Sequence, residues 1–288
     1  MPTTLTDEDW TTLLKRIKAG KCTPFLGSGV CAGVLPLGGE IARKWAKEYN
    51  YPEKDCSDLV RIAQYVAVKY DSMFPKDEII ELFNNLKEPD FKNEEEPHRI
   101  LSELPLPVFL TTNYDNFMAR ALESNGKKPE KELCHWNKQL KDRPSVFDTD
   151  YEPSASQPVV YHLHGNLDIT ESLVLTEDDY LDFLVNISND SSLLPSRIQQ
   201  ALTGASLMFI GYKLEDWDFR VLFRGLVTNK ESSLRRISIT VQLPPDEEGL
   251  RDYLGDYFSK KEMKVYWGTA REFLKELKTR WDKFNHDE

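Results

Sequence analysis

The chain has 288 residues, of which 40% are hydrophobic and 30% are charged, a balance typical of a soluble globular protein with a sizeable core. Its formal net charge of −11 opposes non-specific attraction to nucleic acid or to an anionic membrane surface. The four cysteines include no Cys-x-x-Cys pair, which argues against a zinc ribbon and indicates reduced thiols, and no secretory signal or membrane-spanning run is present, so we expect a cytoplasmic protein.

The first part of the chain predicts a helix, a strand and a glycine-rich turn. Thr6 precedes an acidic turn and an apolar stripe, a pattern that predicts a capped helix ending at Gly20. Residues 22–26 form a short apolar run, which predicts a buried strand. The strand leads into the sequence Gly27-Ser-Gly29-Val-Cys31, and a helix is expected to begin near Gly39.

The middle of the chain predicts a helical insertion and two further strands. Apolar residues recur at helical spacing over about 50–104, too long a segment for a simple crossover, so we expect a helical insertion packed against a sheet. Residues 105–110 and 159–164 are expected to be buried strands. The segment between them, about 125–157, is rich in Lys, Pro, Ser and Asp and predicts a surface excursion.

The last part alternates helices with strands. We expect helical structure over 176–204, strands over 205–210, 237–241 and 263–267, a helix over 216–227, and a final helix after the capping sequence that begins at Thr269. Alternating helices and apolar strands predict an α/β fold, a Rossmann-like parallel sheet with helices on both faces. We expect one domain over 1–288.

Small and polar residues follow four of the predicted strands. They are the glycine loop from Gly27, the segments 111–115 and 162–166, and the segment that begins at Gly211. Ligands bind outside the carboxyl ends of parallel strands, so we expect the four segments to converge on one crevice.

Each candidate residue has a structural and a functional interpretation. Gly27 and Gly29 either form an ordinary tight turn or adopt positive φ and present N–H groups to a pyrophosphate. Asn113 is either a turn residue or an uncharged group that positions a ribose hydroxyl or a water, and Asp115 suits a helix cap. His162 and His164 should share one face of a strand; we expect a structural His162, and a His164 that acts as a general base.

Several motifs together resemble the sirtuin-like NAD hydrolase domains of bacterial antiviral defence proteins. The resemblance extends along essentially the whole chain, and it rests on the segments 25–31, 35–36, 111–115, 162–166, 173–180, 209–218 and 266–268. In sirtuins the corresponding motifs are Gly-Ala-Gly-x-Ser, Thr-Gln-Asn-Ile-Asp, His-Gly and Gly-Thr-Ser.

The resemblance implies roles for individual residues. Asn113 and His164 would be catalytic. The residues that would contact NAD⁺ are Gly27, Ser28, Gly29, Cys31, Thr112, Asp115, Gly211, Tyr212, Trp267 and Gly268. The chain lacks the four-cysteine zinc module of sirtuins, has Thr112 in place of Gln, and has residues 37–39 in place of Asp-Phe-Arg. These departures disfavour protein deacylation and imply no metal at the site.

The function implied is cleavage of NAD⁺ to nicotinamide and ADP-ribose by a regulated, NAD-depleting effector of antiphage defence. Control would come from homo-oligomerisation and from a sensor, either a fused domain or a separate partner such as a HerA-like ATPase or an Argonaute. Two alternatives stay open: a non-catalytic module that binds NAD or ADP-ribose, and, less favoured, an NAD-dependent deacylase.

Overall fold

A seven-stranded parallel sheet forms the centre of the molecule, whose computed structural model describes residues 5–213, 238–245, 248–260 and 262–286. The strands are β1 (Cys22–Leu26), β2 (Val108–Thr111), β3 (Glu130–Leu133), β4 (Val159–His162), β5 (Ser206–Ile210), β6 (Ser238–Gln242) and β7 (Met263–Trp267). They lie in the order β3-β4-β2-β1-β5-β6-β7, and each neighbouring pair is parallel. The predicted α/β fold with a Rossmann-like parallel sheet is therefore confirmed.

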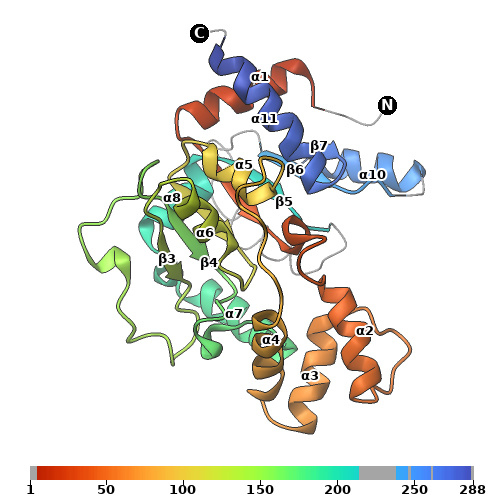
Figure 1. Cartoon of the computed structure of the whole chain (residues 1–288). Coiled ribbons are helices and arrows are strands. Elements are labelled where there is room, and N and C mark those ends of the chain that lie inside the picture. Colours follow the sequence, from red (N-terminus) through yellow and green to blue (C-terminus); the bar gives the residue numbers. More distant parts are fainter. Residues whose placement is uncertain (1–4, 214–237, 246–247, 261, 287–288) are drawn as a thin grey trace.

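Helices cover both faces of this sheet (Figure 1). One face packs against α1 (Asp7–Lys18), α5 (Pro97–Glu103), α6 (Phe117–Ser124) and α11 (Ala270–His286). The other face packs against α7 (Glu177–Asn189), α8 (Ser196–Gly204) and α10 (Glu248–Ser259). Alternation along a strand produces this arrangement, because Phe109 contributes to the first core and its neighbour Leu110 to the second.

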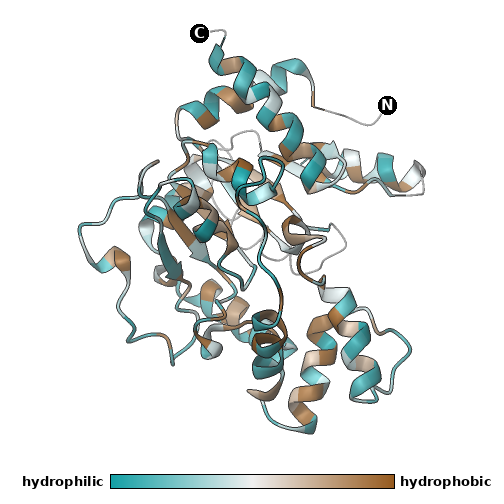
Figure 2. Cartoon of the chain, in the orientation of Figure 1, coloured by the Kyte–Doolittle hydropathy of each residue, from teal (hydrophilic) through white to brown (hydrophobic). Residues whose placement is uncertain are grey.

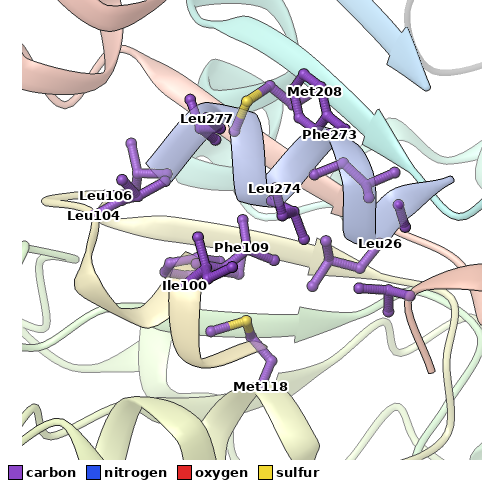
Figure 3. Packing of buried hydrophobic residues seen from close by; sticks show 14 of the residues in the cluster. Leu26, Ile100, Leu104, Leu106, Phe109, Met118, Met208, Phe273, Leu274 and Leu277 are labelled. Atoms are coloured by element: carbon purple, nitrogen blue, oxygen red, sulfur yellow. The ribbon is translucent and has the colours of Figure 1, made fainter. Parts of the chain in front are cut away.

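The helix α11 shows how the first core is built (Figure 3). Phe273, Leu274 and Leu277 recur at helical spacing, are fully buried and point at the sheet. Thr269 and Glu272 cap this helix as the sequence predicts, because the Glu272 carboxylate accepts the Thr269 N–H at 2.7 Å. Figure 2 shows hydrophobic residues concentrated in the central strands and hydrophilic residues over the outer helix faces.

The helix expected near Gly39 and two helices of the predicted insertion form a separate hydrophobic cluster. They are α2 (Gly38–Glu48), α3 (Leu59–Lys69) and α4 (Phe74–Asn84), and Figure 1 shows them on the opposite side of the molecule from α1 and α11. The cluster begins earlier than the expected boundary near residue 50. It also excludes α5, which packs against α6 and α11 in the layer that covers the sheet.

The segment expected to be only a surface excursion contains the edge strand β3. Its sequence, Glu130-Lys-Glu-Leu133, has no apolar alternation and is hydrophilic in Figure 2, which is why the pattern did not predict a strand. Backbone pairing with β4 forms it nevertheless. Glu132 is buried there, and its carboxylate accepts hydrogen bonds from the Ser145 hydroxyl and the Val146 N–H, which offset the cost of burying its charge.

Helical structure over 176–204 is confirmed, although it is divided into α7, a short turn and α8. The helix predicted over 216–227 lies outside the described residues. Within the described ranges, no helix combines the length and the apolar composition that crossing a lipid bilayer would require.

Candidate active site

Four adjacent parallel strands bring the predicted segments to one edge of the sheet. The strands β4, β2, β1 and β5 are consecutive neighbours, so their carboxyl ends lie side by side. The chain passes from β1 to β2 on one side and later returns to β5 on the other. This reversal is the kind of switch point at which open parallel sheets bind ligands. The strand ends that carry the four segments are therefore adjacent, as predicted; the crevice itself stays a prediction.

The glycine loop after β1 is shaped by contact with the loop after β5. The N–H groups of Gly27 and Gly29 donate to the carbonyls of Ile210 and Gly211, both at 2.9 Å. A Cβ on Gly29 would lie 2.8 Å from the Gly211 Cα, and a Cβ on Gly211 would lie 2.5 Å from the Val30 nitrogen. These glycines are therefore needed for close backbone approach.

This geometry corrects one expectation about the loop. We expected Gly27 and Gly29 to use positive φ and to offer their N–H groups to a pyrophosphate. Gly27 has a φ of −115°, and Gly29 is not among the positive-φ glycines; positive φ occurs instead at Gly33 and Gly211, both at 86°. Because both N–H groups are already bonded to carbonyls, an anion at this loop must be held by other groups, and Ser28 is the exposed member of the turn.

Two further predicted contacts, Thr112 and Tyr212, brace the loop from behind. The Tyr212 hydroxyl donates to the Leu26 carbonyl at 2.8 Å and lies 2.9 Å from the Thr112 hydroxyl. The Tyr212 ring packs edge-on against Phe25 in the core, and a Cβ on Gly27 would lie 2.9 Å from it. Tyr212 therefore supports the shape of the loop, and Thr112 is the half-buried member of the pair.

The Asn113 side chain is held in one orientation. Its amide nitrogen donates to the Gly27 carbonyl at 3.2 Å and to the Cys31 sulfur at 3.5 Å. Both N–H groups therefore point at the glycine loop, and the amide oxygen Oδ1 is the atom left to accept a hydrogen bond from a ligand. Asn113 is half-buried, which places a fixed, uncharged acceptor at the edge of the sheet.

Cys31 and Asp115 lie buried beneath Asn113. The Cys31 thiol donates to the Asp115 carboxylate at 3.5 Å, while the other oxygen of Asp115 accepts the Phe117 N–H at 2.9 Å. Burial, followed by the Asp115 charge, raises the pKa of Cys31, so the thiol is neutral. Both residues were predicted to contact NAD⁺; the structure places them behind Asn113. Asp115 accepts the first N–H of α6 but lies one residue before its N-cap, which is Asn116.

His162 is a positioning residue, as expected. Its Nδ1 lies 3.1 Å from the Asn113 carbonyl oxygen, a contact that requires Nδ1 to carry the proton. Its Nε2 then accepts from the Asn166 amide at 3.3 Å. Both ring nitrogens are thus used, and burial lowers the pKa of His162, so a neutral imidazole holds the Asn113 backbone.

His164 has a different set of neighbours, which corrects the expectation that the two imidazoles share a face. The strand β4 ends at His162, so strand alternation does not reach His164. The His164 ring packs edge-on against Tyr180 and Phe183 of α7, each at 5.1 Å between centroids. Gly165 makes the turn, because its φ is 88° and a Cβ there would lie 2.2 Å from a backbone carbonyl oxygen.

The two ring nitrogens of His164 differ in their partners. The Nδ1 lies 3.4 Å from the Tyr180 hydroxyl, whereas Nε2 is buried and has no hydrogen-bond partner among the described residues. Burial lowers the pKa of His164 to about 3, so the imidazole is neutral at physiological pH. A buried nitrogen without a partner is uncommon in folded proteins and is typical of a site that a ligand completes.

Trp267 and Gly268 follow β7, at the far edge of the sheet. With strands about 4.8 Å apart, β7 lies roughly 14 Å from β1, so these residues could reach only the distal part of an extended ligand. The Arg251 guanidinium lies 5.3 Å from the Trp267 ring centre, and the nitrogens Arg251 Nε and Trp267 Nε1 are both buried without a described partner. The sequence singled out neither Arg251 nor Tyr180 as a site residue, because nothing local marks a residue whose partner is distant in the chain.

Several known proteins are similar to this chain. A family model described as a SIR2-like domain matches residues 107–265. A protein named NAD(+) hydrolase ThsA from Cytobacillus dafuensis is 27% identical over 211 residues, which is 73% of this chain and 38% of that protein. Proteins of the same name from Enterococcus faecium and Bacillus cereus (strain MSX-D12) are 27% and 25% identical, over 71% and 77% of this chain and 40% and 43% of their own lengths.

The chain thus spans about two fifths of the length of these curated relatives. A solved structure described as "Structural Basis for the Mechanism and Regulation of Sir2 Enzymes" aligns over 98% of this chain and 100% of its own, with a TM-score of 0.45 and 13% identity.

Proposed function

Because the chain belongs to the SIR2-like family, we propose that it hydrolyses NAD⁺ to nicotinamide and ADP-ribose. The observation that carries the proposal is a pair of polar groups at neighbouring strand ends, an amide oriented by the glycine loop and a buried imidazole nitrogen without a described partner. The Asn113 amide oxygen follows β2, and the unpartnered His164 Nε2 follows β4, which pairs with β2. The three curated relatives described above carry the name of this activity.

The reaction breaks the bond between C1′ of the ribose and the pyridinium nitrogen. The electron pair of that bond goes to nicotinamide, which leaves as a neutral base, and a water oxygen bonds to C1′ while its proton is released. Positive charge develops on the ribose in the oxocarbenium-like transition state. An acceptor oxygen fixed in place can hold a ribose hydroxyl or the water without reorganising, which is the main source of such catalysis.

Each catalytic residue has a role that follows from its surroundings. Asn113 Oδ1 would accept a hydrogen bond from the ribose or from the attacking water, because both amide N–H groups are bound to the glycine loop. In the tautomer whose Nδ1 carries the proton and donates to the Tyr180 hydroxyl, His164 Nε2 would be the base that receives a proton from a ribose hydroxyl or from the water. Trp267 and Gly268 would face the adenosine half.

The test is NAD⁺ turnover measured by chromatographic separation of nucleotides, with Asn113→Ala as the variant. Removing one fixed polar group from a transition-state site costs on the order of 10²–10³-fold in kcat. We expect such a loss with ADP-ribose binding retained in calorimetry. Asn85→Ala, which removes an exposed amide at the end of α4, is the matched control and should leave turnover unchanged.

Two results would contradict the proposal. Equal turnover in Asn113→Ala and in the wild-type protein would remove Asn113 from the mechanism. Wild-type protein that binds ADP-ribose but leaves NAD⁺ intact, at protein concentrations where it self-associates, would favour the non-catalytic module. An acyl-lysine peptide assay addresses the deacylase alternative in the same preparations.

We further propose that the hydrolase acts as a regulated antiphage effector in the cytoplasm, controlled by homo-oligomerisation and by a sensor. Support comes from the resemblance to sirtuin-like NAD hydrolase domains of bacterial antiviral defence proteins and from the relatives named NAD(+) hydrolase ThsA. Expression in a bacterial host that is then challenged with phage tests this role. Cellular NAD⁺ should fall on infection, and Asn113→Ala should abolish both the fall and the protection.

A further inference from the structure

A cluster of soft and hard metal-binding groups lies directly beneath Asn113. Cys31 from the glycine loop, His98 from α5 and Asp115 from the segment before α6 are all buried. The Cys31 sulfur lies 3.9 Å from His98 Nε2 and 3.5 Å from Asp115 Oδ2, and the three atoms all lie within 4.8 Å of one another. The three residues come from separate parts of the chain and do not form a Cys-x-x-Cys zinc motif.

From this cluster we propose that Cys31, His98 and Asp115 bind a Zn²⁺ ion. The donor set favours zinc over Mg²⁺ or Ca²⁺, because thiolate and imidazole are ligands of borderline and soft cations. This site is different from the four-cysteine zinc module of sirtuins, and the proposal does not depend on NAD⁺ hydrolysis.

The spacing of the donors already approaches that of a tetrahedral site. Zinc bonds of about 2.3 Å to sulfur and about 2.0–2.2 Å to nitrogen and oxygen place tetrahedral ligand atoms about 3.4–3.6 Å apart. The separation from the sulfur to the Asp115 oxygen falls in that range, and the separation to the His98 nitrogen exceeds it by a few tenths of an ångström. The third separation, between the His98 nitrogen and the Asp115 oxygen, is at most 4.8 Å, so these two atoms must approach each other by up to about 1.4 Å to close the site.

Groups around the cluster orient two of the three ligands, His98 and Asp115. Glu96 is buried, and its carboxylate oxygen lies 2.8 Å from His98 Nδ1, so Nδ1 carries the proton and Nε2 presents its lone pair to the cluster. A carboxylate behind a histidine ligand is the usual outer partner in zinc sites. The Phe117 N–H likewise holds one oxygen of Asp115 and leaves the other facing the sulfur.

Charge and protons balance when the ion binds. The Cys31 thiol loses its proton to solvent, and the resulting thiolate and the Asp115 carboxylate together neutralise Zn²⁺. The electron pairs of sulfur, nitrogen and oxygen form the three bonds, and a water fills the fourth position. The Asn113 N–H that now contacts the sulfur would remain as a donor to the metal-bound thiolate.

Titration of the intact chain with Co²⁺, a spectroscopic substitute for Zn²⁺, tests the site under anaerobic conditions. We expect one ion per chain, a near-ultraviolet thiolate-to-cobalt charge-transfer band, and loss of that band when Zn²⁺ is added. Cys31→Ser should abolish the band. Cys56→Ser is the matched control, because Cys56 is half-buried and lies away from the cluster, on the chain before α3.

A second variant keeps the test independent of how Cys31→Ser folds. Glu96→Gln retains all three ligands but removes the carboxylate behind His98, and loss of such an outer group weakens metal affinity about 10–100-fold. No charge-transfer band from wild-type protein, or a band that persists in folded Cys31→Ser, would overturn the proposal. Asn113→Ala should retain the band while losing NAD⁺ turnover, so failure of one proposal is distinguishable from failure of the other.

Discussion

The buried imidazole of His164 should make the folding stability depend on pH in a calculable way. In the unfolded chain a histidine has a pKa near 6.5, whereas burial lowers the pKa of His164 to about 3. The unfolded state therefore binds a proton between these values and the folded state does not. Stability from this group is complete above pH 6.5 and is lost as the pH falls toward 3.

The size of the effect follows from the two pKa values. At pH 5 the unfolded histidine is almost fully protonated and the folded one is not, which lowers the free energy of unfolding by about 2 kcal/mol relative to pH 7. The result changes little if the folded pKa is one unit higher or lower, because it stays well below 5. The expected loss is therefore about 2 kcal/mol from one side chain.

Urea unfolding of the wild-type protein and of His164→Gln at pH 7 and pH 5 measures this contribution. The glutamine cannot titrate, so the variant should be less stable than the wild type at pH 7 and should lose about 2 kcal/mol less between the two pH values. Other titrating groups contribute equally to both proteins and cancel in the difference.

Parallel pH dependence in wild type and His164→Gln would refute the reasoning. It would mean that His164 titrates alike in the folded and unfolded chains, and hence that its ring reaches solvent. The proposed role of a dry, neutral Nε2 in hydrolysis would fall with it, because that role uses the same burial.

Two further substitutions test other parts of the structure, each by urea unfolding with a matched control. Gly165→Ala combines positive-φ strain with overlap against a carbonyl oxygen 2.2 Å from the new Cβ, so it should cost several kcal/mol or prevent folding. The control Gly126→Ala, with φ of 77° and open space around the new Cβ, should cost only about 1–2 kcal/mol. Equal losses of stability in the two variants would contradict the overlap at Gly165. Lys76→Met removes a buried ammonium from Asp179, 2.8 Å away, whose half-buried carboxylate keeps the N–H groups of Leu175 and Thr176, so it should cost about 1–3 kcal/mol. Lys131→Met, from an exposed pair, should cost less than about 1 kcal/mol, and a reversed order would contradict the burial argument.

The sequence predicted the fold and the meeting of the strand ends because both depend on local patterns. Apolar runs mark buried strands, and the alternation of strands with helices fixes a parallel sheet whose carboxyl ends share one edge. The edge strand β3 was missed because its backbone pairing does not require apolar side chains. The helix cap at Thr6 was predicted because all its partners lie within three residues, and it is confirmed.

Contacts between distant residues could not be predicted in this way. Cys31 lies 67 positions before His98 and 84 before Asp115, so no spacing rule connects them. The direction of His164 likewise depends on Tyr180 and Phe183, which reach it from a helix later in the chain. The alternation rule failed there because the strand ends two residues earlier.

The glycine loop was predicted from its motif, but its glycines have a different physical role from the one expected. A Gly-x-Gly turn suggests N–H groups that wait for a phosphate, yet here both N–H groups hold the neighbouring loop, and the missing side chains allow two backbones to touch. The loop is therefore rigid before any ligand arrives, and it fixes the Asn113 amide through the Gly27 carbonyl. The glycines would then contribute to catalysis by preorganising Asn113, and their substitution should impair turnover more than it impairs nucleotide binding.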